Sequence, residues 1–466
     1  MKKLIALLIC IPMLALCACR PTPDEEYVVN KGDDKAEEII NQTALPVQNT
    51  VAPTDAEPKS TEEDAAFSWQ EAASQPVFPE RWEDIIDNPY KQIIIEADVI
   101  SGDIEVYPVH LIARHSFTAE DIKNVGRVLF PDASGFGKAL EVARSTITDA
   151  MADVMANEEM KEDAREAQLE FLQDMLGGSR VVDELAFETV SGFDEVPDGS
   201  AANCSVLLAG GTGLVYSSKN GVLLSRCRDG GPAFEIEMDP DSIDIEPELT
   251  LDKAIAYADA FINEAGLNGF ELAASQHERM FDQYTLRDMS SGWSLKYVRT
   301  FGYYPFDANS MDIGDESGFD FGDDMVFAAE WPVERIELYV TSAGVITFSW
   351  TDPAEDTGVV NENVQLMDFD TLSATAKRLL TAAVKSPYWD EGYLKLEECI
   401  LTVVPCQKKD SELAYMMPVW VLRFAEYYSM DGPVMAHFYT PGEQVKNGYD
   451  FTIAFNAIDG TRVSLP

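Results

Sequence analysis

The chain has 466 residues, with 34 Lys and Arg against 82 Asp and Glu, and its formal net charge is −48. A field this negative excludes binding to nucleic acid or to anionic lipid through net charge. Hydrophobic residues make up 46% of the chain, which excludes global disorder, and the length favours roughly two to four domains.

The first 18 residues predict a secretory signal. A positively charged start precedes an almost unbroken apolar run over residues 4–16. A helix of that length rises about 20 Å, against a hydrocarbon core of about 30 Å, so it is too short for a permanent transmembrane span. The run ends in Leu16-Cys17-Ala18-Cys19, which resembles a bacterial lipoprotein signal. The resemblance implies that Cys19 becomes a diacylated N-terminus and anchors the chain on the extracytoplasmic face of the cell membrane. An ordinary signal with an incidental cysteine is the alternative.

The residues after the signal predict a tether and then an N-terminal α+β domain over 89–246. Residues 19–88 are acidic, contain several prolines and keep no hydrophobic period, although 78–86 contains enough apolar residues for a short docking helix. Strands are expected at 93–100 and 104–113, joined as a hairpin through residues 101–103. Thr118, with Asp121 three residues later, predicts a helix N-cap and a helix to about residue 129.

Two further patterns belong to the same N-terminal domain. Apolar positions at helical spacing over 138–176 predict a helical hairpin, inserted in the domain, whose methionines form packing core or an adaptable binding surface. Asn220-Gly221 predicts a tight hairpin between 214–217 and 222–225, since this pair suits a type I′ turn. Cys204 and Cys227 flank this hairpin and form either a disulfide or buried thiols.

The second half of the chain repeats itself at a spacing of about 120 residues. Each copy begins with a helix, at Thr250 and at Asp370, and ends with a hairpin, around residues 342–344 and 458–460. Between these landmarks, each copy carries an arginine followed by a tyrosine pair: Arg299, Tyr303 and Tyr304, then Arg423, Tyr427 and Tyr428. Constant spacing indicates an internal duplication with units at 247–360 and 361–466. A helix that covers several antiparallel strands predicts an α+β fold of tandem helix-on-sheet modules.

The repeated units resemble the PepSY-like modules of Gram-positive envelope proteins. Pro418-Val419-Trp420-Val421 and residues 456–461 carry this resemblance, which covers roughly 247–466. Separately, residues 19–23 and 28–31 resemble the mature start of an uncharacterised lipoprotein family from clostridial-type, anaerobic Gram-positive bacteria. That family implies no activity, whereas PepSY-like modules imply envelope signalling, peptidase inhibition or protein contact. The resemblance therefore implies binding rather than turnover.

Two sets of residues are candidate sites. The repeated arginine and tyrosines are suited to grip a peptide or a glycan, and the alternative is a tyrosine at the core edge beside an Arg–carboxylate pair. The loop over 307–324 is rich in aspartate, and hard oxygen ligands of this kind suit Ca²⁺, although the spacing is not that of an EF-hand. A solvated acidic loop is the alternative to a calcium site. Its candidate ligands are Asp312, Asp315, Asp320 and Asp323.

From these patterns we predict no catalytic residue, no required cofactor and no nucleic-acid partner. The four histidines are dispersed, and neither a His-Glu-x-x-His nor a Gly-x-Ser-x-Gly motif occurs. We expect a membrane-anchored extracytoplasmic lipoprotein that acts as a binding or regulatory module for a protein or peptide of the cell envelope. The alternatives are an envelope hydrolase that cleaves glycan or peptide through carboxylates, and a passive structural protein of the envelope.

Overall fold

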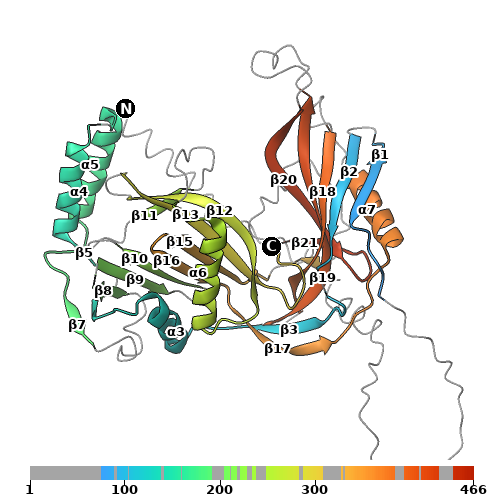
Figure 1. The fold of residues 1–466 in the computed structure, drawn as a ribbon, viewed down its shortest axis with the longest axis horizontal. Coiled ribbons are helices and arrows are strands. Elements are labelled where there is room, and N and C mark those ends of the chain that lie inside the picture. The colour runs from blue at the N-terminus through green and yellow to red at the C-terminus, as the bar shows by residue number, and fades with distance from the viewer. Residues whose placement is uncertain are drawn as a thin grey trace, which may run out of the picture.

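β-Sheet dominates the computed structural model, in which two large sheets build two lobes (Figure 1). The structure describes residues 75–465, apart from 89–91, 103, 138–140, 159, 191–203, 210, 218–220, 228–233, 238–247, 283–286, 308–326, 329–330, 384–392, 409–410 and 430–443. We call the lobe with the nine-stranded sheet lobe A and the lobe with the ten-stranded sheet lobe B. No helix within the described residues has the length and apolar character of a membrane span.

Lobe A combines strands from both ends of the described chain. Its main strand order is β1 (Arg81–Ile86), β2 (Gln92–Ile100), β18 (Tyr393–Gln407), β19 (Leu413–Ser429), β20 (Gln444–Asn456), β21 (Arg462–Ser464) and β14 (Phe327–Ala328). β3 (Val109–Arg114) pairs with β19 and with β17 (Ala354–Asn361). The sheet is mixed, because β2 runs parallel to β18 and β14 parallel to β21. Strands about 300 residues apart in the sequence are therefore neighbours.

Lobe B is built on an antiparallel sheet. Its order is β11 (Phe234–Glu237), β12 (Phe270–Asp282), β13 (Arg287–Arg299), β15 (Arg335–Thr341), β16 (Gly344–Thr351), β10 (Gly221–Cys227), β9 (Gly211–Ser217), β8 (Cys204–Leu208), β4 (Gly135–Gly137) and β7 (Phe187–Thr189). The helices α3 (Ala119–Leu129) and α6 (Leu251–Glu264) bury their apolar faces in the lobe B core. α6 ends where Gly266 takes a φ of +74°, a conformation that glycine adopts at low cost.

The predicted helical hairpin over 138–176 is confirmed. α4 (Arg144–Ala156) and α5 (Glu162–Leu176) pack on each other around a small separate core that includes Ile147, Val154 and Leu172. A short parallel pair, β5 (Val142–Ala143) and β6 (Val181–Val182), joins the two ends of this hairpin. The hairpin stands at the far edge of lobe B from lobe A (Figure 1). Core packing accounts for most of its apolar stripe, while Met155 and Phe171 are exposed.

Several local predictions are confirmed because neighbouring residues alone determine them. Thr118 caps α3 and forms a capping box with Asp121. β9 and β10 pair across residues 218–220, as Asn220-Gly221 predicted. The hairpins β15–β16 and β20–β21 form around residues 342–344 and 458–460. Cys204 differs from these cases, because distant residues of the lobe B core bury its thiol and this burial raises its pKa to about 12.

Two local predictions are wrong because distant strands change the outcome. Residues 93–113 do not form a hairpin, since β2 pairs with β1 and β18 whereas β3 pairs with β17 and β19. Residues 78–86 dock on the body as expected, but they form strand β1 rather than a helix. Phe78 packs edge-on against Trp420, with 4.8 Å between ring centroids, so ordered structure begins within the segment 19–88 that was predicted as a tether.

The prediction of tandem helix-on-sheet modules is also wrong. α6 with β12, β13, β15 and β16 follows the same local order as α7 (Phe369–Ala383) with β18, β19, β20 and β21. Neither set of strands is a complete sheet by itself, because β10 continues the first sheet and β2 continues the second. Helices cover only part of these large sheets, so the protein is a mainly β structure rather than a row of α+β modules.

Pro418 lies on β19, a strand of lobe A that pairs with two different strands along one edge. On one edge of β19, residues 413–416 pair with β3 and residues 419–429 pair with β20. Pro418 lies between these two stretches, where its missing N–H removes no bond to either strand. The same strand is buried over most of its length, with Val419, Trp420 and Val421 at 0% exposure. A motif that resembles a module signature thus lies in the centre of a larger sheet.

Candidate functional site

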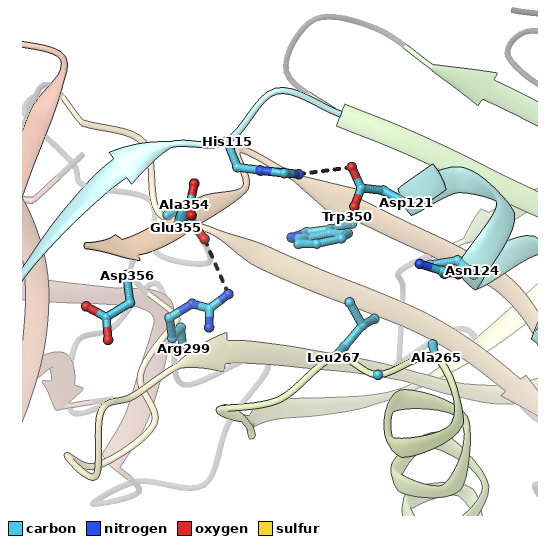
Figure 2. Close-up of a pocket in the computed structure, with 12 residues that line it drawn as sticks. His115, Asp121, Asn124, Ala265, Leu267, Arg299, Trp350, Ala354, Glu355 and Asp356 are labelled. Carbon is cyan, nitrogen blue, oxygen red and sulfur yellow. Dashed lines mark hydrogen bonds and ion pairs between the residues drawn. The ribbon is translucent and has the colours of Figure 1, made fainter. Parts of the chain in front are cut away.

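A cleft with a volume of about 400 Å³ lies where the two lobes meet. His115 follows the end of β3 there, β17 begins there at Ala354, and the other walls come from α3, from the end of α6 and from the end of β13 (Figure 2). β3 and β17 run side by side between the lobes, so the cleft lies beside the two strands that join them (Figure 1). Volumes of this size are typical of small-molecule and side-chain sites.

One wall of the cleft is a histidine–carboxylate pair fixed by the α3 cap. His115 Nε2 lies 3.0 Å from Asp121 Oδ2, which also accepts bonds from the Thr118 amide at 2.8 Å and hydroxyl at 2.7 Å. Burial acts to raise the pKa of Asp121, but the hydrogen bonds from Thr118 and His115 outweigh it and lower this pKa. Asp121 is therefore held as a carboxylate, with its Oδ2 already engaged by three donors.

An aromatic group lies beside this pair. The His115 ring is stacked parallel to Trp350, with 6.4 Å between centroids and 18° between planes. Phe117 and Phe270 meet Trp350 edge-on, at 5.1 and 6.3 Å. Trp350 is 7% exposed, so its ring fills the base of the cleft while its indole N–H donates to Glu334 at 3.0 Å. This packing gives the cleft an aromatic floor.

Arg299 lies in the cleft, but its side chain is almost fully committed to protein partners. Its Nε and Nη2 contact both oxygens of Glu334, at 2.7 and 3.2 Å. Nη2 also lies 3.4 Å from the Ala354 carbonyl oxygen, and the guanidinium carbon is 4.6 Å from the Phe270 ring centroid. Because the Glu334 side chain is only 5% exposed, this pair is a nearly buried ion pair that ties the end of β13 to the residue just before β15. The contact with the Ala354 carbonyl reaches the start of β17.

The mouth of the cleft carries carboxylates on β17. Glu355 and Asp356 are both exposed. Asp356 contacts His110 Nδ1 at 3.1 Å, and the His110 ring stacks on Phe301 with 4.2 Å between centroids. Figure 2 places Asp121 and Asp356 on opposite walls. The cleft therefore combines an apolar floor with a negatively charged mouth.

The first predicted arginine–tyrosine set is divided between the two lobes. Arg299 lies at the end of β13 in lobe B and lines the cleft. Tyr303 packs into the lobe A core, where it is 1% exposed, donates to the Pro108 carbonyl at 3.1 Å and has its pKa raised by burial. Tyr304 is 36% exposed and does not line the cleft.

The second set lies on β19 in lobe A. Arg423 pairs with Glu398 at 3.1 Å. Tyr427 stacks on Tyr393 at 5.4 Å and donates to Glu397 at 2.5 Å, and Tyr428 is a residue of the same strand. Both arginines are thus in ion pairs with carboxylates, and a binding role for the six residues stays a prediction.

The remaining predicted sites lie outside the described residues. Cys19 precedes residue 75, and Asp312, Asp315, Asp320 and Asp323 lie within 308–326. Within the part of the chain that the structure describes, no group of three or more His, Cys, Asp or Glu side chains is placed to hold a metal ion. Lipidation and calcium binding stay predictions.

Sequence reasoning missed most of the cleft. His115 is one of four dispersed histidines in the sequence, and Trp350 and Glu355 belong to no recognisable motif. The one local signal was Asp121, whose capping spacing three residues after Thr118 also places its carboxylate beside His115. The other residues come together only through the pairing of β17 with β3.

Comparisons with known proteins give neither a family nor a function. No family model matches the chain, and no curated protein matches it. A crystal structure of an uncharacterised protein from Eubacterium rectale is similar at 8% identity and a TM-score of 0.42, over 83% of this chain and 94% of that one. The YpeB C-terminal domain of Bacillus megaterium is similar at 10% identity and a TM-score of 0.22, over 69% of this chain and 96% of that one. At these TM-scores, neither structure assigns a fold or an activity to this chain.

Proposed function

We propose that the protein is a lipid-anchored, extracytoplasmic binding or regulatory protein whose ligand enters the cleft between lobes A and B. The observation that carries this proposal is the cleft itself, a space of about 400 Å³ with an aromatic floor and charged walls from both lobes. A peptide or a side chain of an envelope protein fits a site of this size. The anchor and the location rest on the lipoprotein-like sequence that ends at Cys19.

The carboxylates of the cleft suit binding better than hydrolysis. A carboxylate-based hydrolase needs one acid that stays protonated until it donates to the leaving group, and apolar surroundings normally supply that state. Asp121 is held ionised by its three donors, and its pKa is lowered. Glu355 and Asp356 face water. The described residues that line the cleft include no Ser, Thr, Cys or Lys as a nucleophile.

Site-specific cross-linking tests the binding proposal. Leu267, which lines the cleft, is replaced by the photoreactive benzoylphenylalanine, and cells that display the chain are irradiated. We expect a covalent adduct that disappears when Asn124→Trp, on the wall formed by α3, fills the cleft. Ser145→Trp on exposed α4 adds the same ring outside the cleft and should leave the adduct unchanged. An adduct yield that is the same with and without Asn124→Trp would rule out the cleft as the binding site.

Fatty-acid labelling tests the anchor separately. An alkyne-tagged fatty acid supplied to growing cells should label the chain, and Cys19→Ala should abolish the label. Equal labelling of the variant would show that Cys19 is not the lipidated residue.

A further inference from the structure

The charges around the cleft indicate the chemistry of its ligand. Resting on the function proposed above, we infer that the cleft takes an organic cation, a primary ammonium or guanidinium group at the end of an apolar stem. Lysine and arginine side chains of a peptide have this form, and so do free polyamines.

The charge balance of the cleft is negative because its one guanidinium is already neutralised. Arg299 contacts both oxygens of Glu334 and also the Ala354 carbonyl, which leaves it little capacity for an anionic ligand. Three further carboxylates line the same space: Glu355, Asp121, which contacts His115 and accepts from Thr118, and Asp356, which contacts His110. A basic group that enters meets opposite charge on both walls, whereas an anion meets repulsion.

The floor and the inner wall suit an apolar stem. Trp350 presents a ring held by His115, and Val125 and Leu267 contribute aliphatic surface. A lysine or arginine side chain buries three or four methylenes and keeps its charged end in a polar setting, which matches an apolar floor below a ring of carboxylates. Aromatic faces also attract cations by their quadrupole.

The rest of the molecule favours the same ligand charge. The chain carries a formal net charge of −48, so its field draws cations toward its surface and repels anions. Screening by salt weakens this attraction, and the Debye length falls from about 10 Å at 0.1 M to about 3 Å at 1 M salt. Binding of an organic cation should therefore weaken as salt is added.

Calorimetric titration of the full chain with acetyl-Gly-Lys-Gly-amide tests the inference. The matched peptide with norleucine in place of lysine keeps the stem and removes the charge, and a third peptide carries glutamate. We expect the lysine peptide to bind at least tenfold more tightly than either comparator. Putrescine distinguishes the two sources of the cation. An affinity for putrescine equal to that for the lysine peptide would identify a free amine as the ligand, and a weaker affinity would identify a peptide side chain.

Two variants separate recognition in the cleft from attraction by the whole chain. Glu355→Gln should weaken the lysine peptide about tenfold, which corresponds to about 1.4 kcal/mol. Glu80→Gln removes the same charge from an exposed residue just before β1 and should leave the affinity unchanged.

Three results would overturn the organic cation: equal binding of the norleucine peptide, an unchanged affinity for Glu355→Gln, or Ca²⁺ that binds with the same dependence on Glu355. No binding by any cationic probe, together with a cross-linked adduct from position 267, would refute the ligand class and leave the binding function standing. If no cationic probe binds and no adduct forms from position 267, the binding function is refuted as well.

Discussion

A buried carboxylate in lobe B makes stability depend on pH in a calculable way. Glu278 on β12 is 1% exposed, and its Oε1 receives no hydrogen bond from the described residues. Burial first, and the nearby Glu337 carboxylate second, raise the pKa of Glu278 to about 7, while Lys296 opposes the rise. The ordinary pKa of this group is 4.5. The folded state therefore holds a proton that the unfolded state releases at lower pH.

The sign of the effect follows from proton linkage. Between pH 4.5 and about 7 the folded chain binds more protons at Glu278 than the unfolded chain does, so the free energy of unfolding falls as pH rises. The whole shift corresponds to at most about 3 kcal/mol. Glu278→Gln removes the titrating group and keeps the shape. Relative to the parent chain, the variant should be more stable by less than about 1 kcal/mol at pH 5 and by up to about 3 kcal/mol at pH 8.

Urea unfolding followed by tryptophan fluorescence at pH 5, 6, 7 and 8 measures this difference. The midpoint of the variant should move progressively above that of the parent chain as pH rises. Glu80→Gln, an exposed residue, gives the control and should show no such trend. A midpoint difference that is independent of pH, or a variant that is less stable at pH 8, would refute the assigned environment of Glu278.

Other perturbations test the packing around the cleft and the cores. Arg299→Ala leaves the nearly buried Glu334 carboxylate without its guanidinium partner, so urea unfolding should show a loss of about 3 kcal/mol, and a loss below about 1 kcal/mol would contradict the buried pair. Gly213→Ala places a Cβ 2.6 Å from the Phe130 ring and should cost about 1–3 kcal/mol by the same assay, whereas a neutral result would contradict this close approach. Burial raises the pKa of Cys399, so a thiol reagent at pH 8 should modify it only after unfolding in urea, and rapid labelling of the folded chain would contradict its burial.

Local signals predicted local structure well. Thr118 with Asp121, Asn220-Gly221 and the turn at 342–344 each depend on a few neighbouring residues, and each forms the expected element. The order of helix and strands after Thr250 and after Asp370 also matches in the two halves. Such features need no information from elsewhere in the chain.

The pairing of distant strands was not predictable from these patterns. Residues 93–100 have the composition of a strand, but nothing in them specifies β18 as a parallel partner. Residues 81–86 pair with β2 and bury Trp82 and Ile86, and nothing within this short segment specifies that pairing. The same limit applies to the cleft, because Arg299 was the single predicted site residue there and its neighbours depend on how β3 and β17 pair.

Photo-cross-linking from position 267 tests the ligand site between the lobes most directly when two chains are compared, one with the cleft open and one with the cleft filled by Asn124→Trp. We expect a covalent adduct from the first chain and none from the second. Equal adducts from both chains, or an adduct that is lost with Ser145→Trp instead, would contradict a ligand site between the lobes.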